Sequence, residues 1–240
     1  AAERIGTLVR SHEQLLASQK SLLASASHEL RSPLARIRMS LELMGGDSSP
    51  SLRQEISRNI AELDQLIDEI LLASRLDARE ADLGTVEPVD LVGLVAEECA
   101  RAGAEFDWQP PSPTDRSAAA APAVLPVQGV AKLLRRLVRN LLDNARRHGA
   151  GDVSVSLRAV QGQAELRVAD RGPGVPPALR ERIFEPFFRL PGATERDGGV
   201  GLGLALVRSI ALRHGGSVSC VERPGGGACF VLRLPLPAPA

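Results

Sequence analysis

Aromatic side chains are scarce in this chain: they make up 2% of 240 residues, with one tryptophan and no tyrosine. Three of the five phenylalanines, Phe184, Phe187 and Phe188, nevertheless fall within five consecutive positions. Aliphatic side chains must therefore build most of the core. The local concentration of phenylalanine indicates a special task for residues 184–188.

Other absences narrow the class of protein. Apolar runs stay well short of the roughly 20 residues that a membrane-spanning helix needs. The net charge is zero, from 29 basic and 29 acidic residues, which argues against an overall basic nucleic-acid-binding protein. The three cysteines, Cys99, Cys220 and Cys229, form no CxxC pair, so we interpret them as buried thiols in a reducing compartment.

Apolar residues recur at helical spacing through the first part of the chain, on both sides of a break at residues 45–50. The pattern predicts two long helices joined by a short turn, an all-α helical hairpin over residues 11–76. One hairpin has little to bury its apolar stripe against, so we expect two copies to pair as a dimeric four-helix bundle. Residues 77–85 are small and charged and are interpreted as a linker.

Residues 86–240 mix helix and strand patterns without strict alternation. Helices are predicted at 89–102, 130–148 and 202–214, and strands at 106–108, 153–160, 164–169, 217–221 and 228–234. We expect an α+β two-layer sandwich with the helices on one face of the sheet.

His28 lies about 200° around its predicted helix from the apolar Leu30, so its ring is expected to face water. Glu29 can accept a hydrogen bond from one ring nitrogen, which leaves the other nitrogen nucleophilic. Ser32 follows one turn later on the same face. An ordinary solvated surface histidine is the alternative interpretation.

The segment Ser27-His28-Glu29-Leu30-Arg31-Ser32-Pro33-Leu34 resembles the H-box of bacterial sensor histidine kinases of two-component systems. The resemblance implies that His28 accepts the γ-phosphoryl group of ATP, and that Glu29 orients and activates it as hydrogen-bond acceptor and base. Ser32 stands where the family commonly has a Thr or Asn that supports phosphatase activity toward the regulator.

Asn140, Asn144 and Arg147 are spaced i, i+4, i+7 and share one face of a predicted helix, opposite its apolar side. Amide oxygens can bind Mg²⁺ and an arginine can bind phosphate, although a solvated polar face is the alternative. Residues 139–148 resemble the N-box of the same kinases. The resemblance implies that Asn140 and Asn144 hold Mg²⁺, that Arg147 binds phosphate and that His148 stacks on the nucleotide.

Asp170 ends a predicted strand, and Gly172 and Gly174 follow it. A carboxylate only accepts hydrogen bonds, so it suits the exocyclic amine of adenine, and glycines permit close backbone approach to a base. A plain strand-ending turn is the alternative. The segment resembles the G1 box, whose aspartate reads adenine in the family.

A glycine-rich stretch, residues 198–204, precedes the last predicted helix, and backbone amides at a helix N-terminus form an anion site. The stretch lacks the Lys-Ser/Thr of a Walker A loop and does not follow a strand as a Rossmann fingerprint would. It resembles the G2 box, and residues 184–189 resemble the F-box. The resemblance implies a mobile ATP lid at 189–200 and nucleotide contacts from Phe187, Arg189, Gly199, Gly201, Leu202, Gly203 and Leu204.

These boxes stand in the family's order, which implies a Bergerat-type (GHKL) ATP-binding domain over residues 86–240, behind a dimerisation and phosphotransfer domain over residues 11–76. The implied activity is Mg²⁺- and ATP-dependent autophosphorylation of His28, followed by transfer to an Asp of a response-regulator receiver domain, with regulator phosphatase activity as an addition. A GHKL-type ATPase or serine kinase without histidine transfer is one alternative. A degenerate, non-enzymatic kinase that acts as an interaction module is the other.

Residues 1–10 are interpreted as the end of an upstream, HAMP-like signalling helix, because their periodic pattern begins without a clear cap. The resemblance implies that the chain is the cytoplasmic portion of a bacterial inner-membrane protein. We expect a homodimer that contacts the membrane only through upstream segments, and no nucleic-acid partner.

Overall fold

The computed structural model describes Leu30, residues 34–37, Met39, Leu41 and residues 50–77, 83–110, 124–149, 151–191 and 200–237. The chain divides into two compact units, Ala1–Arg79 and Glu80–Ala240. Among the described residues, none of the helices combines the length and the hydrophobicity that a membrane span requires.

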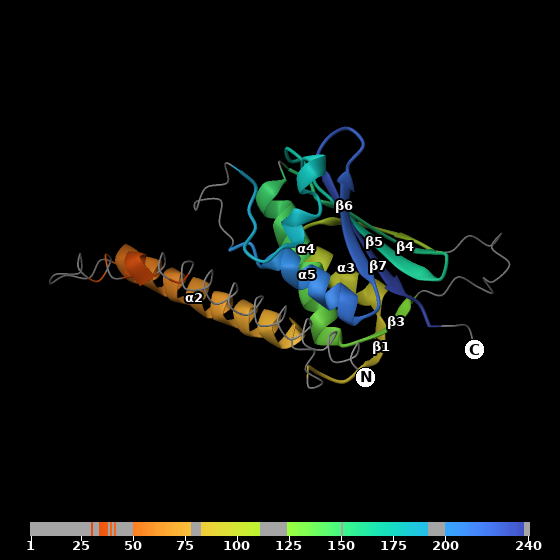
Figure 1. Cartoon of the computed structure of the whole chain (residues 1–240), viewed down its shortest axis with the longest axis horizontal. Coiled ribbons are helices and arrows are strands. Elements are labelled where there is room, and N and C mark those ends of the chain that lie inside the picture. Colours follow the sequence, from red (N-terminus) through yellow and green to blue (C-terminus); the bar gives the residue numbers. More distant parts are fainter. Residues whose placement is uncertain are drawn as a thin grey trace, which may run out of the picture. The chain divides into compact units, whose positions relative to one another are not determined.

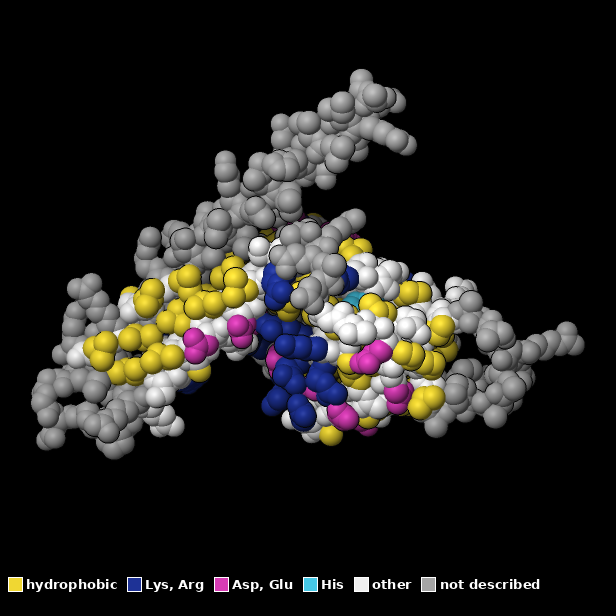
Figure 2. All heavy atoms as spheres, turned by 90° about the horizontal axis from the view of Figure 1, so that it is seen from below, with side chains coloured by type: hydrophobic (Ala, Val, Ile, Leu, Met, Phe, Trp, Pro, Cys, Tyr) yellow, Lys and Arg dark blue, Asp and Glu magenta, His cyan; other side chains and the backbone are white. Residues whose placement is uncertain are grey.

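The main described element of the first unit is helix α2 (Pro50–Asp77), which follows the predicted break. Its buried Asn59 accepts a 2.9 Å hydrogen bond from Nε of Arg36, so a second helical stretch lies beside it. Leu66, Ala73 and Leu76 are buried, whereas Ile60, Ile67 and Leu71 are 44–56% exposed. Hydrophobic side chains are accordingly visible along this unit in Figure 2. The helix thus carries more apolar surface than the single chain covers.

A five-stranded sheet forms one layer of the second unit, in the order β2-β4-β5-β7-β6 (Figure 1). The strands are β2 (Glu105–Gln109), β4 (Ser154–Val160), β5 (Gln163–Ala169), β6 (Ser217–Glu222) and β7 (Ala228–Pro235). Strand β2 pairs with β4 in parallel, and the other pairings are antiparallel. Side chains alternate between the two faces, and Ala164, Leu166 and Val168 of β5 are completely buried on the inner face.

Three helices, α3 (Leu91–Ala102), α4 (Ala131–His148) and α5 (Gly203–Arg213), cover that inner face (Figure 1). Seven apolar residues of α4 are buried: Leu133, Leu134, Leu137, Val138, Leu141, Leu142 and Ala145. The predicted α+β sandwich with helices on one face is therefore confirmed.

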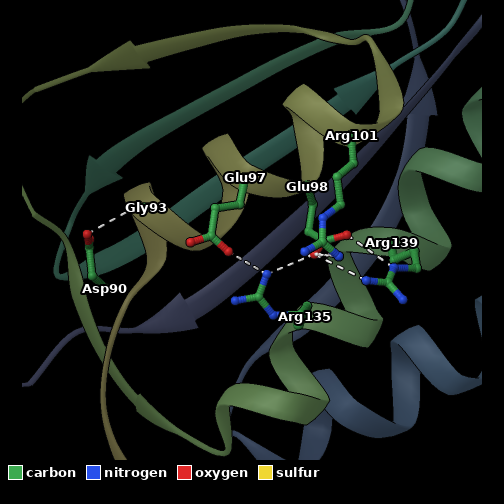
Figure 3. Close-up of polar contacts among 7 residues, drawn as sticks. All are labelled: Asp90, Gly93, Glu97, Glu98, Arg101, Arg135 and Arg139. Atoms are coloured by element: carbon green, nitrogen blue, oxygen red, sulfur yellow. Dashed lines mark hydrogen bonds and ion pairs between the residues drawn. The ribbon is translucent and has the colours of Figure 1, made fainter.

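The start of the first helix of this unit was predicted two residues too early. Residues 87–90 form strand β1 (Glu87–Asp90), which pairs antiparallel with β3 (Pro126–Gly129). The helix begins at Leu91 because the Asp90 carboxylate caps it, accepting from the backbone nitrogen of Val92 at 3.1 Å and from that of Gly93 at 3.2 Å. Figure 3 shows the bond to Gly93. This two-stranded sheet was missed, since strands of four residues carry almost no periodic signal.

One residue of the phenylalanine cluster at 184–188 belongs to the hydrophobic core, and the others are half-buried. Two short 3₁₀ helices, η1 (Pro177–Leu179) and η2 (Arg182–Phe184), follow β5. Phe184 is buried, and its ring meets that of Phe230 edge to face with centroids 6.5 Å apart. Phe188 is half-buried below the guanidinium of Arg182, whose Cζ lies 4.6 Å from the ring centroid.

The outer face of the sheet holds a buried carboxylate, Glu165 of β5. It accepts hydrogen bonds from Arg158 of β4, Arg167 of β5 and Arg233 of β7 at 2.5–3.0 Å. Burial raises the pKa of Glu165, but the three arginines outweigh that effect and lower it to about 2. This ion cluster ties three adjacent strands together.

Candidate functional site

Asn140 of α4 lies against the first turn of α5, where its Nδ2 donates to the carbonyl oxygen of Gly203 at 3.1 Å. Asn140 and Asn144 are both half-buried. The prediction that they lie opposite the apolar side is therefore wrong; they flank it, because α4 packs against α5 as well as the sheet. The bond uses the amide nitrogen of Asn140 and leaves Oδ1 as the atom that can bind a cation.

Asp170 follows β5 directly, as predicted, and is 3% exposed. Its Oδ1 accepts from the backbone nitrogen of Gly172 at 2.8 Å and from that of Ala228, the first residue of β7, at 3.2 Å. The backbone of Asp170 also donates to the Ala228 carbonyl at 3.0 Å. These bonds hold the carboxylate in one orientation and leave Oδ2 as the oxygen available to a ligand.

The turn after Asp170 touches the C-terminal end of α4. A Cβ added to Gly172 would lie 2.2 Å from the carbonyl oxygen of His148, a distance at which the backbone has to shift. Only glycine fits this approach, so the N-box and G1-box segments are in direct contact. His148 itself is exposed, as is Arg147.

A further contact, between Phe187 and Gly201, joins the phenylalanine cluster at 184–188 to the glycine-rich stretch before α5. The Phe187 nitrogen donates to the Gly201 carbonyl at 3.0 Å, and both residues have a left-handed φ, 62° and 78°. A Cβ on Gly201 would lie 2.8 Å from the carbonyl carbon of Phe187. A hydrogen bond therefore joins Phe187 and Gly201, the residues on either side of the predicted lid at 189–200.

The remaining predicted residues are divided between the described part of the chain and the part outside it. Leu202 is buried, and Gly174, Arg189, Gly203 and Leu204 are half-buried. Residues 192–199, with Gly199, lie outside the described residues, as do His28, Glu29 and Ser32.

His214 is a residue that the sequence interpretation missed. Its Nδ1 donates to the Ile210 carbonyl at 2.7 Å, and its Nε2 accepts from the backbone nitrogen of Val130 at 3.0 Å, directly before α4. Burial lowers the pKa of His214, although the bond to Ile210 opposes the shift. The neutral ring thus links the end of α5 to the start of α4. The sequence pattern around His214 does not predict its contact with Val130, which is 84 residues away.

The described residues contain no group of three or more His, Cys, Asp or Glu that could hold a metal ion. Mg²⁺ at a nucleotide does not require such a group, because phosphate oxygens and water supply most of its ligands. The half-buried amides of Asn140 and Asn144 can supply the few protein ligands that Mg²⁺ then needs.

Two family models match the chain: the His Kinase A (phospho-acceptor) domain over residues 18–79, and the histidine kinase-, DNA gyrase B- and HSP90-like ATPase domain over residues 129–238. The sensor protein RstB of Escherichia coli strain K12 is 40% identical over 223 residues, which make up 92% of this chain and 50% of RstB. The chain belongs to the sensor histidine kinase family.

Two solved structures are also similar to this chain. The mycobacterial sensor histidine kinase MprB is 31% identical with a TM-score of 0.50, covering 63% of this chain and 98% of MprB. Full-length ShkA, solved in complex with AMPPNP, is 28% identical with a TM-score of 0.59, covering 92% of this chain and 46% of ShkA. This chain spans about half the length of the curated relatives it matches.

Proposed function

We propose that this chain is the catalytic core of a sensor histidine kinase, which transfers the γ-phosphoryl group of Mg-ATP to His28 and then to an aspartate of a response-regulator receiver domain. The observation that carries the proposal is the fixed carboxylate of Asp170 beside the contacts that join α4, the turn at 170–174 and the start of α5. Family membership supplies the class of reaction.

Asp170 is the proposed adenine-binding residue. Its Oδ2 accepts a hydrogen bond from the exocyclic amine, and a carbonyl at that position would face a carboxylate that cannot donate. Gly172 and Gly174 let the base approach the backbone. The similar protein ShkA was solved in complex with AMPPNP, an adenine nucleotide analogue, which supports an adenine nucleotide as the ligand.

The phosphate end of the nucleotide is assigned to α4 and the start of α5. Oδ1 of Asn140 and the amide of Asn144 hold Mg²⁺, which neutralises charge on the phosphates when it is bound. Arg147 and the backbone amides of residues 199–203 bind phosphate oxygens. Phe187 and Arg189 hold the base of the lid.

In the proposed transfer, the free ring nitrogen of His28 attacks the γ-phosphorus, and the bond to the bridging oxygen breaks so that ADP leaves. Glu29 accepts the hydrogen bond, and then the proton, of the other ring nitrogen. An aspartate of the regulator subsequently attacks the phosphorus, and the nitrogen–phosphorus bond breaks. The Ser32 hydroxyl can orient water for hydrolysis of the phosphorylated regulator.

We also assign a homodimer. Ile60, Ile67 and Leu71 form a line of exposed apolar side chains along α2. A second copy of this helix covers such a line in a four-helix bundle. We place the chain in the cytoplasmic portion of a longer membrane sensor, in keeping with the family.

The test is incubation of the chain with ATP labelled in its γ-phosphate. The wild type should become labelled when Mg²⁺ is present, and His28→Gln should not. Label on the His28→Gln variant would refute the proposed acceptor. A matched control is His12→Gln, which changes another histidine of the same unit and should leave labelling intact.

A further inference from the structure

A buried carboxylate joins α3 to α4 without taking part in the proposed chemistry. Glu98 of α3 is 2% exposed, and its oxygens accept from Arg135 at 2.9 Å and from Arg139 at 3.1 and 3.3 Å (Figure 3). Arg101 adds an ion pair at 3.7 Å. Burial raises the pKa of Glu98, but the hydrogen bonds from Arg139 and Arg135 outweigh burial and lower it.

The two principal partners stand one turn apart on α4, so the carboxylate fixes that helix at two points. Arg139 is also the immediate neighbour of Asn140, whose Nδ2 is bound to Gly203 of α5. Helix α4 is therefore held by directional polar bonds on the side facing α3 and on the side facing α5. The other buried side chains of α4 are aliphatic. Their contacts are not directional, so they restrict the rotation of the helix less sharply than these hydrogen bonds do.

We propose that Glu98 is a positioning residue for the nucleotide site: it fixes the rotation of α4 and thereby the direction in which Asn140 and Asn144 present their amides. This inference rests on the proposed binding of Mg-ATP. A rotation of roughly 10° moves an atom at the rim of a helix, about 5–6 Å from the axis, by about 1 Å. Displacements of that size matter in a phosphoryl-transfer site.

The chain offers two matched controls. Glu97 is the neighbour of Glu98 and also binds Arg135, at 2.6 Å, but its side chain is 59% exposed. Glu165 is as buried as Glu98 and is likewise held by three arginines, but it lies on the outer face of the sheet. Glu165→Gln therefore reproduces the destabilisation that follows the loss of a buried ion cluster, in a cluster whose three arginines all lie on strands.

The experiment compares Glu98→Gln, Glu97→Gln and Glu165→Gln in the full 240-residue chain. Three quantities are measured: the Kd for ATP with Mg²⁺, the thermal midpoint, and the NMR signals of the Asn140 side-chain amide without nucleotide. Glu98→Gln should raise the Kd about tenfold, as loss of a supporting residue does in metal sites. It should also shift the Asn140 signals. Both controls should keep the Kd within about twofold. Glu165 lies on the outer face of the sheet, and in Glu97→Gln the Glu98 carboxylate keeps its bonds to Arg135 and Arg139.

Two results would overturn the proposal. One is a Glu98→Gln protein with wild-type Kd and unchanged Asn140 signals; the other is equal weakening by Glu98→Gln and Glu165→Gln, which would leave stability as the whole effect. If Glu98→Gln does not fold, Arg139→Gln replaces it, because Glu98 then keeps Arg135 and Arg101, and unchanged Asn140 signals again overturn the proposal. A wild type that does not bind ATP refutes the proposed function instead, and the nucleotide-free NMR signals still decide the positioning role.

Discussion

Replacing Asp170 by Asn separates the binding role of this carboxylate from its role in the fold. The asparagine oxygen can occupy the Oδ1 position and accept from Gly172 and Ala228, as the carboxylate does at 2.8 and 3.2 Å. A flipped amide would face these two N–H groups with its own NH₂ group, so the oxygen stays on that side. The free energy of unfolding should therefore change by less than about 1 kcal/mol.

The atom facing the nucleotide, in contrast, changes from an acceptor to a donor. A hydrogen bond to a charged group contributes about 1.5–3 kcal/mol, which corresponds to a rise of about tenfold to 150-fold in the Kd for ATP. Inosine triphosphate carries a carbonyl where ATP carries the amine, so the variant should discriminate less between the two nucleotides than the wild type does.

Titration calorimetry with both nucleotides, alongside a thermal melt, measures these changes. Unchanged affinity for ATP in a folded Asp170→Asn protein would refute the assignment of Asp170 to adenine. A large loss of thermal stability would refute the argument that the two backbone bonds survive the substitution.

Two further predictions concern assembly and pH. Ile67→Asp puts a charge on the exposed apolar line of α2 and removes roughly 2 kcal/mol of apolar burial per chain, so it should shift the dimer toward monomer in sedimentation. Asp68→Asn, on the same helix, is its control, and an Ile67→Asp protein that remains dimeric would contradict the proposed interface. His214 has a folded pKa below its ordinary 6.5, so the unfolded chain binds the proton more readily. The contribution of His214 to the free energy of unfolding should be complete above pH 6.5 and should be lost as the pH falls from there through the folded pKa. Urea unfolding should show a weaker acid dependence in His214→Asn than in the wild type, and identical pH slopes would exclude the effect.

Elements with strong periodicity were predictable from the sequence, and contacts across the chain were not. The helix at 131–148 and the hairpin of β4 and β5 match their predicted positions closely, because their apolar patterns are long and regular. The face of Asn140 was predicted wrongly, because the periodicity of one helix does not reveal that α5 packs beside it. The short β1–β3 sheet left no usable pattern.

In the candidate site too, some residues were predictable from the sequence, whereas the contacts between distant segments were not. Asp170 was recognisable from its turn and its resemblance to the G1 box, but its second backbone donor comes from Ala228, 58 residues away. Glu98 and Arg139 are separated by 41 residues, and the sequence around each of them indicates only an ordinary charged position on a helix. Their joint effect on α4 depends on packing, which no motif encodes.

The central claim is transfer of a phosphoryl group to a histidine, and the chemical stability of the labelled protein tests it most directly. After incubation with Mg²⁺ and γ-labelled ATP, the label should be lost in acid, persist in alkali and map to the peptide that contains His28. Acid-stable label on a serine, or ATP hydrolysis without any labelled protein, would contradict the account and favour a serine kinase or a GHKL-type ATPase.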